Sequence, residues 1–76
     1  MITVKHILSG DDHTDQKFLV LEASVEGTPV VKRRSINTAA LVDGTLTLER
    51  EKAALIADVT EYHARWLAVQ EALKSL

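Results

Sequence analysis

Carboxylate and imidazole side chains gather in one short stretch of the chain, at Asp11, Asp12, His13 and Asp15. Such ligands can hold a divalent cation, but an EF-hand loop needs alternating ligands, a Gly at its sixth position and a Glu at its twelfth. The spacing here differs from that pattern. Aspartates also favour turns because they accept hydrogen bonds from nearby backbone amides. We therefore predict a polar hairpin loop over residues 9–15 and assign no metal ligand, while cation binding by this loop stays open.

Three histidines, His6, His13 and His63, could in principle combine as zinc ligands. No two of them stand four residues apart as on a zinc-binding helix, and the chain has no cysteine to complete a structural site. His6 falls on the apolar side of an expected strand, and His63 lies beside the apolar stripe of an expected helix. Both positions are typical of packing residues, so we predict no metal site and no catalytic histidine.

Motifs for phosphate binding and covalent catalysis are also missing. Gly10, Gly27 and Gly44 are isolated, and none opens a glycine-rich segment into a helix. No nucleophile is paired with a base, and a chain of 76 residues rarely encloses a substrate pocket. The sequence predicts a protein that is not an enzyme, with no cofactor and no small-molecule substrate.

A basic cluster, Lys32, Arg33 and Arg34, could contact the phosphates of a nucleic acid. Alternate residues of a strand point to opposite faces, so the three side chains would not form one flat patch. The net charge is −2, whereas nucleic-acid binders usually show a strong basic excess. Nucleic-acid association, or an inhibitory or regulatory role through this edge strand, is kept as the alternative hypothesis.

The first third of the chain has the alternating pattern of strands. Residues 2–8 place one set of side chains on a single side: Ile2, Val4, His6 and Leu8. Residues 17–25 place a more apolar set on one face: Leu19, Leu21, Ala23 and Val25. A tight turn at residues 26–29 leads into a third strand at residues 30–36. We expect a three-stranded antiparallel meander over residues 1–36, with the second strand central. If Val25 pairs with Val30, Glu22 faces Arg33 and can form a cross-strand ion pair.

The connector over residues 37–47 has two readings. Residues 37–42 can form a short helical turn that stops at Gly44 in the left-handed conformation. Asp43 and Gly44 can instead form a two-residue hairpin turn between short strands. We favour the helical turn because Ala39 and Ala40 suit a helix better than a strand.

The last third predicts one long helix over residues 48–76, because no Gly or Pro follows Thr45. Thr47 can cap its first turn through the side-chain hydroxyl. Large apolar residues recur every three or four positions and therefore share one face. These residues form the predicted stripe: Leu55, Val59, Tyr62, Trp66, Val69, Leu73 and Leu76.

The length of this helix predicts a partner. Residues 48–76 would span roughly 43 Å at the rise of an α-helix, whereas strands of seven or eight residues reach only about 25 Å. The helix should therefore extend past the sheet while its stripe stays apolar. We expect the middle turn, with Tyr62 and Trp66, to pack on the sheet. The ends are then left for a second copy or another protein, since exposed apolar patches usually mark interfaces.

Composition bounds the remaining possibilities. A chain of 76 residues forms one small domain with a marginal core, and self-association is a common way to add buried area. The sequence contains no apolar run long enough to span a bilayer and no secretory signal. We expect an α+β protein of the cytoplasm, or of a particle assembled there, that acts in assembly or as an adaptor. Its size and composition are typical of phage and mobile-element accessory proteins.

Overall fold

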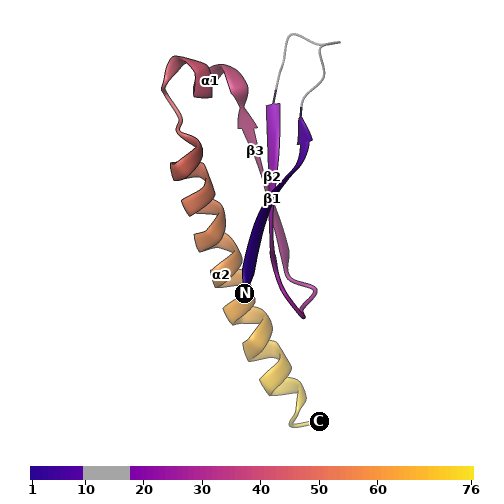
Figure 1. Cartoon of the computed structure of the whole chain (residues 1–76). Helices are drawn as coiled ribbons and strands as arrows, with labels where there is room; N and C mark the ends of the chain where they lie inside the picture. The colour runs from indigo at the N-terminus through magenta and orange to yellow at the C-terminus, as the bar shows by residue number, and fades with distance from the viewer. Residues whose placement is uncertain (10–17) are drawn as a thin grey trace.

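The computed structural model describes residues 1–9 and 18–76, so the acidic cluster at residues 11–15 and His13 lie outside the described residues. The described elements follow in the order β1 (Ile2–Ser9), β2 (Phe18–Val25), β3 (Val31–Asn37), α1 (Thr38–Asp43) and α2 (Leu48–Leu73). The strands form an antiparallel sheet in the order β1-β2-β3, and α2 packs across one of its faces (Figure 1). The predicted α+β meander with a long C-terminal helix is confirmed.

The β2–β3 register is the one that the tight turn predicts. The Val25 amide donates to the Val30 carbonyl at 3.2 Å, and Gly27 in the turn has a φ of +79°. Glu22 consequently stands opposite Arg33, and the two side chains form the predicted cross-strand ion pair.

The β1–β2 register contains an irregularity that the sequence pattern did not reveal. His6 lies opposite Leu21, but Leu8 lies opposite Val20, so the pairing shifts at Ile7. An extra residue in one strand interrupts the alternation of side chains. The regular pairing expected of an alternating strand therefore does not continue past His6. His6 itself is exposed, so the prediction that it is a packing residue was wrong.

The connector contains a helix, so the helical alternative is confirmed and the hairpin is excluded. The side chain of Asn37 accepts a hydrogen bond from the Ala39 amide and caps α1. Gly44 ends α1 with a φ of +86°, a conformation that costs glycine little because it has no Cβ. The Asp43 carboxylate accepts a hydrogen bond from the Thr45 amide at 2.8 Å and so stabilises the turn that follows.

Helix α2 begins as predicted and ends three residues earlier than predicted. The Thr47 hydroxyl accepts a hydrogen bond from the Arg50 amide at 3.3 Å. At the other end, the Lys74, Ser75 and Leu76 amides donate to carbonyls three residues back, which is the hydrogen bonding of a tighter turn. The prediction that α2 continues to Leu76 was wrong, because this turn replaces its last residues.

The core fills the space between the sheet and the first half of α2. Its buried apolar side chains come from β2, from β3 with the residue before it, and from α2: Leu21, Ala23, Val25, Val30, Ile36, Leu55 and Val59. The β2 residues among them belong to the face that the sequence predicts to be apolar. The second half of α2 contributes only the partly buried Trp66 to the edge of this core.

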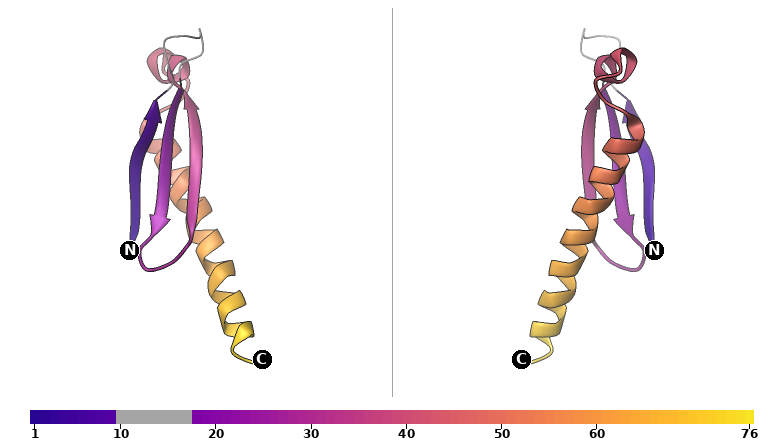
Figure 2. Two further views of the ribbon diagram at one scale, coloured as in Figure 1. Left: turned by 90° about the vertical axis from the view of Figure 1, so that its right-hand side faces the viewer. Right: turned by 90° about the vertical axis from the view of Figure 1, so that its left-hand side faces the viewer.

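Helix α2 is longer than the sheet beneath it. Its 26 residues span about 39 Å at the α-helical rise, while the eight residues of β2 reach about 26 Å. Both directions of view show α2 crossing the sheet obliquely and continuing beyond the end at which β2 turns into β3 (Figures 1 and 2). The molecule is accordingly elongated, with a longest dimension of 52 Å. The predicted mismatch between helix and sheet is present in the structure.

Candidate protein interface

The structure divides the predicted apolar stripe of α2 into a covered half and an exposed half. Leu55 and Val59 are 1% and 0% exposed and belong to the chain's own core. Val69 and Leu73 are 54% and 50% exposed, and Leu76 in the turn after the helix is fully exposed. We call Val69, Leu73 and Leu76 the distal face. Apolar residues with the same helical spacing are therefore buried in the core in the first half of the stripe and exposed to solvent in the second half.

Tyr62 and Trp66 lie at the border between these halves. The Lys32 ammonium lies 5.0 Å from the centre of the Tyr62 ring, within the range of a cation–π contact. The His63 and Trp66 rings are stacked with their centres 6.1 Å apart, and Trp66 packs against the core. The middle turn of α2 is therefore held at the sheet by both residues, although Tyr62 is still 41% exposed.

Charges beside the distal face are already paired within the helix. The Lys74 ammonium lies 3.3 Å from the Glu71 carboxylate, and Arg65 pairs with Glu61 one turn back. Arg65, one turn before Val69, lies on the same side of α2, while Gln70 and Ala72 at the edges of this face carry no charge. The distal face is thus apolar without a ring of unpaired charge around it.

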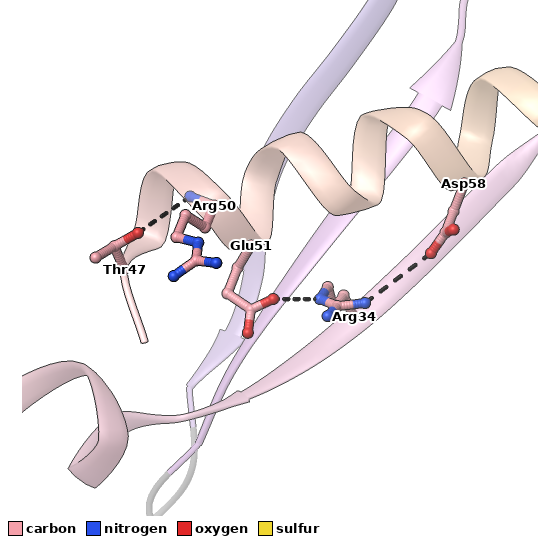
Figure 3. Close-up of polar contacts among 5 residues, drawn as sticks. All are labelled: Arg34, Thr47, Arg50, Glu51 and Asp58. Atoms are coloured by element: carbon pink, nitrogen blue, oxygen red, sulfur yellow. Dashed lines mark hydrogen bonds and ion pairs between the residues drawn. The ribbon is translucent and has the colours of Figure 1, made fainter. Parts of the chain in front are cut away.

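An ion pair beneath the first half of α2 was missed by sequence reasoning (Figure 3). The Nε of Arg34 on β3 donates to Glu51 at 2.6 Å, and its guanidinium also lies 4.0 Å from Asp58. Glu51 is buried, with 8% of the residue exposed. The available signal was its spacing, because Glu51 precedes Leu55 and Val59 by whole helical turns and so belongs to the face that meets the sheet.

The predicted basic cluster is split between the two faces of the sheet. Lys32 and Arg34 point toward α2, where they meet Tyr62 and Glu51. Arg33 contacts Glu22 at 3.0 Å, and Lys5 lies 3.7 Å from the same carboxylate. Each basic side chain of the cluster already has a partner, so their geometry gives no support to the nucleic-acid alternative.

Two surface hollows, of about 420 and 400 Å³, flank α2. The first is lined by Lys32, Asp58, Glu61, Tyr62 and Arg65. The second is lined by Arg34, Thr45, Leu46, Thr47, Arg50, Glu51 and Ala54. In the described part of the chain, every buried polar side-chain atom has a hydrogen-bond partner. Over residues 1–9 and 18–76, no three acidic or histidine side chains gather as metal ligands.

Comparisons with known proteins give no functional assignment. No protein-family model matches the chain, and neither a curated protein nor a solved structure is significantly similar to it. Within the described ranges, neither helix has the length and hydropathy needed to cross a bilayer. Among the surfaces described above, the distal face is the one whose apolar side chains do not contribute to the chain's own core.

Proposed function

We propose that this chain is a non-enzymatic protein–protein interaction module that docks through the distal face of α2. In this role it self-associates or binds another protein, as a small assembly or adaptor component. The observation that carries the proposal is the exposure of Val69 and Leu73 at about half of their surface on a stripe whose first half is core. Clustered apolar side chains that a fold leaves uncovered usually mark an interaction site.

The geometry of α2 supports this role. The segment beyond Trp66 adds little to the core, yet it remains helical to Leu73 and keeps its apolar spacing. An exposed helix that serves only as a solvated extension needs no large apolar residues on one side. Helix-in-groove and helix-pair recognition both use anchors at this spacing. We place the protein in the cytoplasm or in a particle assembled there, and its size and composition suit an accessory protein of a phage or mobile element.

Photo-crosslinking in the native cells tests the proposal. A photoreactive residue replaces Leu73 on the distal face in one variant and Ala64, which is exposed on the opposite side of the helix, in the control. We expect a protein adduct, with a second copy or with another protein, at position 73 only. The adduct should disappear when Val69→Asp is added. Absence of any adduct at 73, or equal adducts at both positions, would overturn the proposed function.

A further inference from the structure

The outer edge of β1 is an unpaired edge of the sheet in the part of the chain that the structure describes. There β1 pairs with β2 alone. Helix α2 begins on the β1 side of the sheet and ends beyond β3, so it diverges from the start of β1 (Figure 2). The backbone groups along an uncovered edge can pair with another extended chain.

The hydrogen bonds between β1 and β2 fix which backbone groups face this edge. The Glu26 amide donates to the Met1 carbonyl at 3.0 Å, so these two residues form a hydrogen-bonded pair of the ladder. Hydrogen-bonded and non-hydrogen-bonded pairs alternate along antiparallel strands, and Thr3 therefore also bonds to β2. Ile2 and Val4 occupy the alternate positions and direct their N–H and C=O groups away from β2. The edge thus presents donors and acceptors two residues apart, as an added strand requires.

The side chains of the two sheet edges differ in the same respect. Edge strand β3 carries three consecutive basic residues, 32–34, and charge on an edge strand discourages pairing with another chain. Over residues 2–5, before the irregularity at Ile7, β1 carries only one charged side chain, Lys5. Its ammonium lies 3.7 Å from the Glu22 carboxylate of its own chain. The start of β1 therefore lacks the charged protection that β3 has.

The start of β1 is complementary to a second copy of itself. We propose that two copies pair antiparallel through their β1 edges, with a twofold axis at Thr3, so that their two sheets become one. Ile2 then lies opposite Val4 of the second copy, and each such pair exchanges two backbone hydrogen bonds. These β-branched side chains lie on the α2 face of the sheet, where both pack against the edge of the core. On the other face Thr3 meets Thr3 of the second copy, which is a stabilising cross-strand pair.

Neighbouring registers give poorer matches. An axis between two residues would set outward-facing backbone groups opposite groups that already bond to β2. An axis at Lys5 would set two ammonium groups opposite each other, and like charges destabilise a strand pair. An axis at Val4 would set Thr3 opposite Lys5 and Ile2 opposite the imidazole of His6. The axis at Thr3 alone matches apolar with apolar and hydroxyl with hydroxyl.

Helix α2 leaves room for this pairing. The twofold axis of an edge-to-edge antiparallel pair stands perpendicular to the sheet, so both copies keep α2 on the same face. The distal half of α2 continues past β3, at the opposite edge from β1, and does not block the second copy (Figure 2). The shared stretch is short, and its area is below the roughly 1,200 Å² of a standard stable interface. The pair is therefore reversible and forms as the protein concentration rises.

Amide hydrogen exchange, resolved by residue in NMR spectra over a range of protein concentrations, tests which edge pairs. The Val4 amide should exchange about tenfold more slowly once nine in ten chains are paired, because only the unpaired chain exchanges there. The Ser35 amide is the matched control, since by the same alternation it faces outward from β3. Its exchange should not depend on concentration.

Disulfide trapping tests the register, because the chain contains no native cysteine. Thr3 and Lys5 are both exposed on the face without α2, so Thr3→Cys and Lys5→Cys form a matched pair of variants. At the proposed axis the two Thr3 Cα atoms are about 4.5 Å apart, within the range of a disulfide. The two Lys5 Cα atoms are offset by four residues, or about 13 Å. In a thiol redox buffer, Thr3→Cys should form several-fold more dimeric disulfide than Lys5→Cys.

The outcomes separate this inference from the proposed function, on which it does not rest. A monomer at every concentration, or unchanged Val4 exchange in a solution that contains dimers, would overturn the β1 pairing. Equal disulfide yields from Thr3→Cys and Lys5→Cys would overturn it as well. None of these results affects adducts at position 73 of α2. Conversely, Val69→Asp should abolish those adducts and leave the concentration-dependent protection of Val4 unchanged.

Discussion

The divided stripe of α2 predicts opposite consequences for the same substitution at two positions. Leu55→Ala removes a side chain that is 1% exposed and packed in the core. Buried Leu→Ala changes cost about 2–5 kcal/mol, from lost burial and from the cavity left behind. We expect about 3 kcal/mol here. Stabilities of about 0.05–0.15 kcal/mol per residue would give a chain of this length only about 4–11 kcal/mol in total.

Leu73→Ala removes the same atoms from a side chain that is 50% exposed. It leaves no cavity in the chain's own core, so the free energy of unfolding of the monomer should change by at most about 0.5 kcal/mol. Its effect should appear in association instead. If the distal face pairs copies of the chain, the wild-type and Leu55→Ala proteins should gain stability as the protein concentration rises, because binding to the folded state alone stabilises it. Leu73→Ala should then lose most of that gain.

Urea unfolding, followed by helical circular dichroism and by Trp66 fluorescence, measures both quantities over a range of protein concentrations. The slope with denaturant should stay constant if only stability changes. The division of the stripe would be refuted if Leu73→Ala destabilised the dilute monomer by more than about 1.5 kcal/mol, or if Leu55→Ala cost less than about 1 kcal/mol. Either result would mean that burial in the structure does not describe what α2 contributes to folding.

Two further predictions concern polar contacts. Glu51→Ala leaves the Arg34 guanidinium without its closest partner. We expect the free energy of unfolding, measured in urea, to fall by about 1.5 kcal/mol. This loss is below that of a fully buried pair because the Arg34 side chain is 38% exposed. A double-mutant cycle with Arg34→Ala should show coupling between the two, and additive losses would contradict the pair. Hydrogen bonds from the Thr45 hydroxyl and amide lower the pKa of Asp43 below its usual value. This contribution to stability is present above the unfolded-state pKa and is lost as the pH falls through the lower folded-state pKa. Thr45→Ala should raise the Asp43 pKa in a carboxyl NMR titration, and an unchanged value would contradict the contact.

Local chemistry predicted much of the fold. Gly44 marked the end of α1 because only glycine adopts its positive φ of +86° without strain. Thr47 marked the start of α2 because its hydroxyl can bind a free amide of the first turn. The tight turn before Val30 set the register that brings Glu22 to Arg33. Each feature depends on residues close together in the sequence or on a pairing that one turn fixes.

Features that depend on two elements at once were not predicted. The irregularity at Ile7 is a property of β1 against β2, and alternation along one strand does not show it. Arg34 and Glu51 meet only because α2 crosses β3 at that point. Tertiary geometry, rather than local preference, decides both. The end of α2 at Leu73 is a local feature that no Gly or Pro signals, because the Lys74, Ser75 and Leu76 amides donate to carbonyls three residues back.

Periodicity alone also gave no means of telling the covered half of the stripe from the exposed half, because both halves have the same spacing. Length was the deciding quantity, since a helix longer than its sheet must leave part of one face uncovered. The uncovered part of α2 stays helical because it continues the half that is packed on the sheet. Ion pairs one turn apart, such as Glu61 with Arg65 and Glu71 with Lys74, add to its stability. An isolated segment of this length would be marginal as a helix in water. The sheet thus supports a rigid extension that it does not cover, and a partner that binds the distal face meets an already ordered helix and loses less conformational entropy on binding.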